Sequence, residues 1–119
     1  MRVLLVEPNV HWRDGYTYYL RDEGWDVDPA ATVQLSEVAV RPYAAAIVDA
    51  SVQSDNGQPL WQALAHSAGY PVIALALTPA QEEALRQASP PHVLYLVKPF
   101  SLSRLSLFLR HLQVQTNVA

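Results

Sequence analysis

The chain has 119 residues, half of them hydrophobic and 16% charged, with a formal net charge of −3. This length supports one domain with one hydrophobic core, and the weak negative charge argues against nucleic acid binding by this chain. The lack of cysteine excludes disulfides and thiolate-bound zinc, and no apolar run is long enough to form a membrane-spanning helix.

Short apolar runs alternate with helical patterns along the whole chain. In chain order they predict strand 2–6, helix 9–23, strand 25–29, helix 32–40, strand 44–49, helix 59–66, strand 71–77, a helix from 78, strand 93–97 and a helix from 101. Strands that are apolar throughout are typical of parallel sheets covered by helices on both faces. The pattern therefore predicts an α/β fold, a flavodoxin-like doubly wound (βα)5 with a five-stranded parallel sheet in the order 2-1-3-4-5.

Two of the predicted helices carry apolar stripes at helical spacing. In the first helix Trp12, Tyr16 and Tyr19 share one face, which predicts that they are core residues. The stripe of the last helix consists of Leu102, Leu105, Leu109 and Leu112. Leu107 and Phe108 lie beside this stripe, so they are candidates for an exposed apolar docking patch.

Charged residues stand where three of the predicted strands end. Glu7 follows the first strand, Asp49 ends the third, and Lys98, the only lysine of the chain, follows the fifth. Ligands of open parallel sheets bind beyond the carboxyl ends of the strands, so these side chains are expected to converge. Two carboxylates and an ammonium suit Mg²⁺ and a phosphoryl group, with Asp49 as the nucleophile that forms an aspartyl phosphate.

Several segments together carry a family resemblance. They are VLLVE at 3–7, GWDV at 24–27, IVD at 47–49 with Gly57 eight residues later, PVI at 71–73 and YLVKPF at 95–100. With these segments the chain resembles, along essentially its whole length, the receiver domain of bacterial two-component response regulators. The resemblance implies a cytoplasmic signalling domain that is a phosphoacceptor at most and not an enzyme.

The resemblance also implies roles for individual residues. Asp49 would accept phosphate from a histidine kinase, and Lys98 would pair with that phosphate. The Lys98–Pro99 peptide bond would be cis. The Mg²⁺ ligands would be Glu7, Asp49 and the backbone carbonyl of Ser51. Tyr95 would be the switch aromatic.

Three positions depart from the family pattern. The second acid after the first strand is replaced by Pro8, the hydroxyl residue near the end of the fourth strand by Ala76, and the proline after the phosphorylated aspartate by Gln53. Losing a carboxylate predicts weak Mg²⁺ binding, and losing the hydroxyl removes the usual link between phosphate and Tyr95. The sequence therefore indicates an atypical receiver, or a pseudo-receiver that acts as a protein-interaction or dimerisation module without phosphate.

Partners and boundaries follow from the same resemblance. We expect a histidine kinase or another signalling protein as partner, and a homodimer whose interface includes Tyr95, Leu107 and Phe108. Residues 1–113 would form the receiver-like domain, and 114–119 a tail or the start of a linker to an output domain.

Two enzyme or cofactor folds with related sheets fit less well. Haloacid-dehalogenase-type phosphatases need a second aspartate two residues after the nucleophile, where this chain has Ser51. Flavodoxin-like flavin carriers need a hydroxyl-rich phosphate loop after the first strand, where this chain has Glu7, Pro8, Asn9 and Val10.

Overall fold

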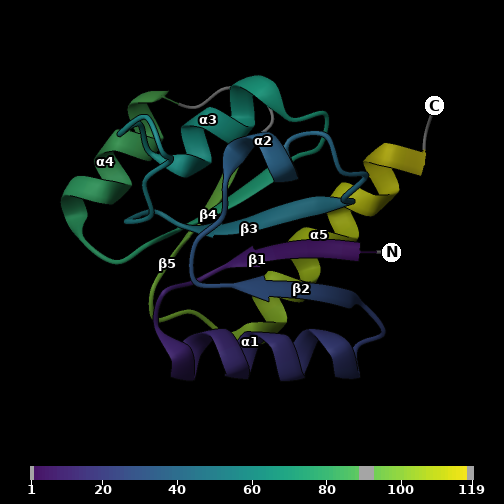
Figure 1. Cartoon of the computed structure of the whole chain (residues 1–119). Coiled ribbons are helices and arrows are strands. Elements are labelled where there is room, and N and C mark those ends of the chain that lie inside the picture. Colours follow the sequence, from purple (N-terminus) through teal and green to yellow (C-terminus); the bar gives the residue numbers. More distant parts are fainter. Residues whose placement is uncertain (1, 89–92, 118–119) are drawn as a thin grey trace.

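Strands and helices alternate in the computed structural model, which describes residues 2–88 and 93–117 (Figure 1). The strands are β1 (Arg2–Val6), β2 (Asp26–Ala30), β3 (Ala45–Asp49), β4 (Val72–Ala76) and β5 (Val93–Val97). The helices are α1 (Val10–Asp22), α2 (Leu35–Val38), α3 (Leu60–Ser67), α4 (Pro79–Ala88) and α5 (Leu102–Asn117). The predicted α/β class is therefore confirmed.

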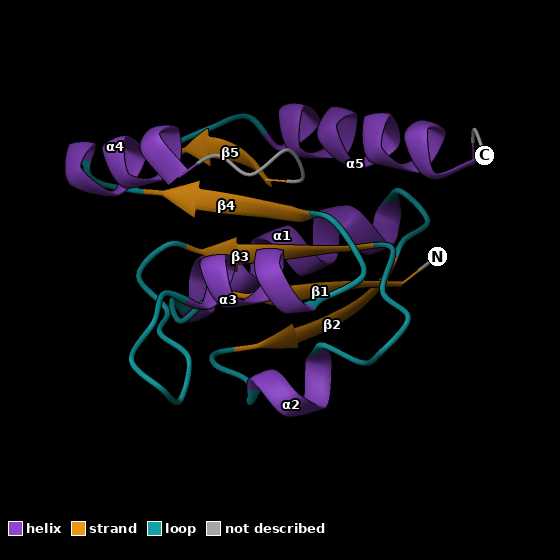
Figure 2. Cartoon of the chain, turned by 90° about the horizontal axis from the view of Figure 1, so that it is seen from above, coloured by secondary structure: helices purple, strands orange, loops and turns teal. Residues whose placement is uncertain are grey.

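The five strands form one parallel sheet in the order β2-β1-β3-β4-β5, which confirms the predicted topology. In the register of the sheet, Leu4 of β1 lies opposite Asp28 of β2 on one side and Ala46 of β3 on the other. Figure 2 shows that the arrowheads of all five strands point to the same edge of the sheet. The loops that follow β1, β3 and β5 therefore begin side by side at that edge.

Helices cover both faces of the sheet, and alternate strand residues feed two separate cores. Helices α1 and α5 pack on the face that carries Val3, Leu5 and Ile47, whereas α2, α3 and α4 pack on the face that carries Leu4 and Val48 (Figure 1). The central strands β3 and β4 are buried along their whole length. Because side chains alternate between faces along a strand, a strand covered on both sides is apolar along its length, and in β3 only the last residue, Asp49, departs from this.

Strand β2 differs because it lies at the edge of the sheet. It contains Pro29, which cannot donate a backbone hydrogen bond and is tolerated in edge strands. The helix that follows is shorter than the predicted 32–40, since α2 spans only four residues. Its N-cap residue Gln34 makes no side-chain capping bond, and Pro42 disfavours helical geometry at Arg41.

One core prediction in α1 is wrong. Tyr16 and Leu20 are buried and Tyr19 is half-buried. Trp12, one turn before Tyr16, is 37% exposed. Trp12 lies in the first turn, next to the loop that leaves β1, and its ring lies over the ammonium of Lys98. The apolar stripe therefore ends before the first turn of the helix.

The C-terminal helix continues beyond the predicted domain limit at residue 113. Helix α5 extends to Asn117, and residues 118–119 of the predicted tail lie outside the described residues. The stripe of Leu105, Leu109 and Leu112 is buried, as its spacing predicts. Within the described part of the chain, none of the helices combines the length and apolarity that crossing a membrane requires.

Replacing Ile47 by alanine tests the central packing. Ile47 is fully buried in β3, so Ile47→Ala is expected to lower the free energy of unfolding by about 2–5 kcal/mol in denaturant titrations. Val40→Ala is the control, because Val40 is 84% exposed and its loss should change stability by less than about 0.5 kcal/mol. Equal losses in the two variants would contradict the assignment of β3 to the core.

Candidate functional site

Three charged side chains meet at the carboxyl edge of the sheet. Glu7 directly follows β1, Asp49 is the last residue of β3, and Lys98 directly follows β5. The Lys98 Nζ lies 2.5 Å from Glu7 Oε1 and 2.7 Å from Asp49 Oδ1. We refer to Glu7, Asp49 and Lys98 as the ion triad. Residues 49 and 91 positions apart from Lys98 in the sequence are thus brought into contact by the parallel sheet.

The triad is buried, and its carboxylate oxygens all have partners. Glu7, Asp49 and Lys98 are 1%, 5% and 5% exposed. The second oxygen of Glu7 accepts the backbone N–H of Asn9 at 3.1 Å. The second oxygen of Asp49 accepts the backbone N–H of Ser51 at 3.1 Å and also the Ser51 hydroxyl. Each acid is therefore held by the ammonium on one oxygen and by its own loop on the other.

Burial makes the triad interdependent. Removing charged groups from water is costly, and the cost is offset only where the charges are paired and hydrogen-bonded. Two carboxylates and one ammonium leave a net charge of −1 in a buried site. This charge acts on the neighbouring Tyr16. Burial raises the pKa of the Tyr16 hydroxyl, and the negative charges of Glu7 and Asp49 raise it further.

The backbone at the end of β5 fixes where Lys98 starts. The Lys98 N–H donates to the carbonyl of Ala76 at 2.7 Å, and the Lys98–Pro99 peptide bond is cis. Ala76 is fully buried at the end of β4 and brings no hydroxyl to the site. Thr78 does not replace it, because the Thr78 hydroxyl accepts the backbone N–H of Gln81 as the N-cap of α4. The position of Ala76 thus offers the triad only a backbone contact.

Tyr95 is half-buried on the face of the sheet that α2, α3 and α4 cover, where it packs against the core. A side-chain hydrogen bond with Tyr95 raises the pKa of Arg86 on α4, and the charge of Glu83 raises it further.

The residues of the expected docking patch differ in exposure. Leu107 on α5 is 59% exposed, whereas Phe108 is half-buried against the core under α1 and α5. Only Leu107 offers a largely free apolar side chain at this position.

The donor set of the site fits Mg²⁺ in kind. Carboxylate and carbonyl oxygens are the ligands that Mg²⁺ takes, and it is commonly held by one or two protein carboxylates together with water. Glu7 and Asp49 are near enough to share a cation, since both contact the same ammonium. A metal ion would need the oxygens that Lys98 already engages, so it has to compete with the ammonium. Among residues 2–88 and 93–117, there is no cluster of three or more His, Cys, Asp or Glu side chains suited to a metal ion.

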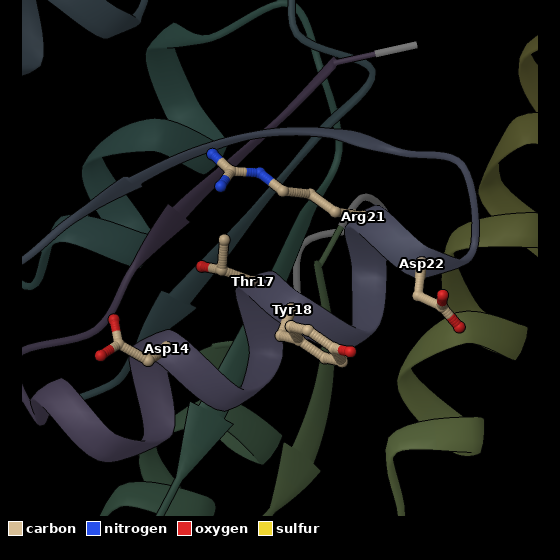
Figure 3. A pocket seen from close by; sticks show the side chains of 5 residues that line it. All are labelled: Asp14, Thr17, Tyr18, Arg21 and Asp22. Atoms are coloured by element: carbon tan, nitrogen blue, oxygen red, sulfur yellow. The ribbon is translucent and has the colours of Figure 1, made fainter.

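A surface pocket of about 370 Å³ lies on α1, away from the triad. Its lining side chains come from one helix, and they are Asp14, Thr17, Tyr18, Arg21 and Asp22. Figure 3 shows Asp14 and Asp22 at opposite ends of this row, while Arg21 extends toward β2, where it donates to the carbonyl of Val27 at 3.1 Å. The two acids do not converge, so the pocket does not form a second charged site.

The contacts around the triad include residues that sequence patterns did not indicate. The indole of Trp12 lies over Lys98, with 4.0 Å between Nζ and the ring centroid. The guanidinium of Arg13 donates to the carbonyl of Glu7 at 2.9 Å. Only their position in the sequence could have indicated these contacts, because α1 begins three residues after Glu7.

Replacing Lys98 by alanine tests whether the triad is interdependent. The change leaves two buried carboxylates without a counter-charge, and we expect it to lower the free energy of unfolding by about 3–5 kcal/mol. Arg110→Ala is the control, because it breaks an ion pair with Glu23 in which the arginine side chain is 58% exposed. That loss should stay below about 1 kcal/mol. Denaturant unfolding measures both, and similar small losses would contradict a buried, mutually dependent triad.

Comparisons with known proteins agree with the geometry at the level of the fold. No protein-family model matches the sequence, and no curated protein matches it significantly. A response regulator from Desulfuromonas acetoxidans is 24% identical, with a TM-score of 0.76 over 99% of this chain and 98% of that chain. A CheY-like receiver domain protein from Methanospirillum hungatei JF-1 is 20% identical, with a TM-score of 0.76 over 99% and 98%. NtrX from Brucella abortus is 23% identical, with a TM-score of 0.73 over 98% of this chain but only 28% of NtrX. The chain therefore has the fold of response-regulator receiver domains.

Proposed function

We propose that this chain is a cytoplasmic receiver-type signalling domain in which Asp49 accepts a phosphoryl group from a histidine kinase. The observation that carries the proposal is the contact of 2.7 Å between Lys98 Nζ and Asp49 Oδ1 at the carboxyl edge of a receiver fold. An aspartate alone at a strand end has many explanations. An aspartate held by the only lysine of the chain, on this fold, is suited to bind and pair with a phosphoryl group.

The transfer itself needs few groups. A carboxylate oxygen of Asp49 forms a bond to phosphorus while the bond from phosphorus to the donor breaks, that is, the P–N bond of a phosphohistidine or the P–O bond of acetyl phosphate. The electron pair leaves with the donor, as imidazole that takes a proton or as acetate. Lys98 then pairs with the phosphoryl oxygens. Mg²⁺, held by Glu7, Asp49 and the Ser51 carbonyl, would supply charge neutralisation for the phosphoryl oxygens.

The same contacts support slow phosphorylation and weak Mg²⁺ binding. Both oxygens of Asp49 are engaged, one by Lys98 and the other by Ser51, and the residue is 5% exposed. Pro8 adds no carboxylate that would favour Mg²⁺ over the ammonium. Because Ala76 has no hydroxyl, a phosphoryl group on Asp49 lacks the usual side-chain link toward Tyr95. These features support an atypical receiver.

A second candidate function is a protein-interaction module that works without phosphate. It is favoured by the triad itself, in which the ammonium already occupies the place between the two acids. In such a pocket each carboxylate already has a cationic partner without a phosphoryl group. The two functions share the fold and differ in whether Asp49 reacts.

Treatment with acetyl phosphate and Mg²⁺ distinguishes these functions. We expect slow addition of one phosphoryl group, measured by mass spectrometry of the intact protein, and loss of this adduct in Asp49→Asn. Asp55→Asn is the matched control, since Asp55 is an exposed carboxylate of the same loop and should leave the adduct unchanged. Complete absence of an adduct after prolonged incubation would contradict the phosphoacceptor and favour the phosphate-independent module.

We also propose a homodimer that forms through the surface of α4, β5 and α5. Leu107 of α5 supplies an exposed apolar anchor there, and the half-buried Tyr95 of β5 and Phe108 of α5 would complete the interface. Leu107→Glu is expected to weaken self-association at least about tenfold in sedimentation equilibrium, because it places a charge in an apolar contact. Val40→Glu, on a distant exposed apolar residue, should have no effect. A wild-type monomer at high concentration would contradict this interface.

A further inference from the structure

The ammonium of Lys98 has a third neighbour besides the two acids. Its Nζ lies 4.0 Å from the centroid of the Trp12 ring, which is within the range of a cation–π contact. An ammonium has three N–H donors, and the two carboxylates take the sides that face Glu7 and Asp49. The indole face covers a further side.

The exposures of the two side chains show which of them faces water. The Lys98 side chain is 2% exposed, whereas Trp12 is 37% exposed. Trp12 contacts the ammonium with one part of its surface and solvent with another. The indole therefore separates this side of the triad from water.

Local hydrogen bonds hold Trp12 in this place. The backbone N–H of Trp12 donates to the Asn9 side-chain oxygen at 3.0 Å, and the backbone N–H of Asn9 donates to Glu7 Oε2 at 3.1 Å. Arg13, the next residue of α1, donates to the Glu7 carbonyl at 2.9 Å. One acid of the triad, the helix cap and the backbone of Trp12 are thus tied together in the first turn of α1, and the ring extends from there over the ammonium.

We propose that Trp12 is a positioning residue that acts through Lys98. Its ring holds the ammonium against both acids and closes the pocket, so it limits the entry of Mg²⁺ and of small phosphodonors. The part of this inference that concerns phosphodonors rests on the proposed function. The part that concerns the ammonium and Mg²⁺ does not.

The only lysine of the chain makes the contact directly measurable. Selective isotope labelling of lysine gives one side-chain spin system, and the indole ring current should shift its methylene protons upfield. This shift should disappear in Trp12→Leu and persist in part in Trp12→Phe, which keeps a ring. Tyr18→Leu is the control, because Tyr18 lies on the same helix, is 78% exposed and should leave the shift unchanged. An unshifted lysine in the wild type would overturn the proposal.

The gating role is tested on the same variants. Titration with Mg²⁺ alone, followed on the Lys98 resonance, should reach its midpoint at an approximately fivefold lower concentration in Trp12→Leu, the factor expected from losing one cation–π contact. The rate of adduct formation with acetyl phosphate should rise by a similar factor, and Trp12→Phe should lie near the wild type in both. An unchanged or higher midpoint in Trp12→Leu would overturn the proposal that Trp12 limits the entry of Mg²⁺. A wild type that forms no adduct while the midpoint still falls would overturn the proposed function and support the gate.

Discussion

The site depends on placing one ammonium between two buried carboxylates. Each carboxylate depends on the ammonium and the ammonium depends on the carboxylates, since an unpaired buried charge costs several kcal/mol. The parallel sheet meets this requirement by ending β1, β3 and β5 at one edge, so that Glu7, Asp49 and Lys98 are brought together without long loops. The apolar strands therefore have a function beyond stability, because their register fixes where the charges lie.

The departures from the receiver pattern act on the same balance of charge. A second acid in place of Pro8 would increase the negative charge and favour a divalent cation over a single ammonium. A hydroxyl in place of Ala76 would give a phosphoryl group a partner on β4. Our proposal therefore expects the resting contacts of Lys98 to be favoured over their replacement. The half-buried Tyr95 packs against the core on the face of the sheet covered by α2, α3 and α4.

Most of the fold was predictable from the sequence, because the constraint on it is simple. Strands covered on both faces must be apolar along their length, and residues 45–48 and Val72–Ala76 show this pattern directly. The convergence of Glu7, Asp49 and Lys98 also follows, since it needs only the strand ends and the parallel order. The limits of individual helices were harder to predict, as the short α2 shows. They depend on caps and tertiary contacts, which the sequence of segment 32–40 does not reveal.

The surroundings of the triad were less predictable for a physical reason. The spacing of Trp12, Tyr16 and Tyr19 indicates a shared helix face, but it does not show where along the helix the sheet ends. The ring of Trp12 covers the charge of Lys98 instead of filling the core. The Ser51 hydroxyl and the backbone N–H of Asn9 also contact the acids. These contacts depend on the geometry of loops, which no periodic pattern in the sequence indicates.

The most direct test of this account is a crystal structure of the protein at neutral pH without divalent cations. It should place Lys98 Nζ within hydrogen-bonding distance of both Glu7 and Asp49, under the ring of Trp12. A Lys98 side chain that extends into solvent, with the two carboxylates separated by water, would contradict the account.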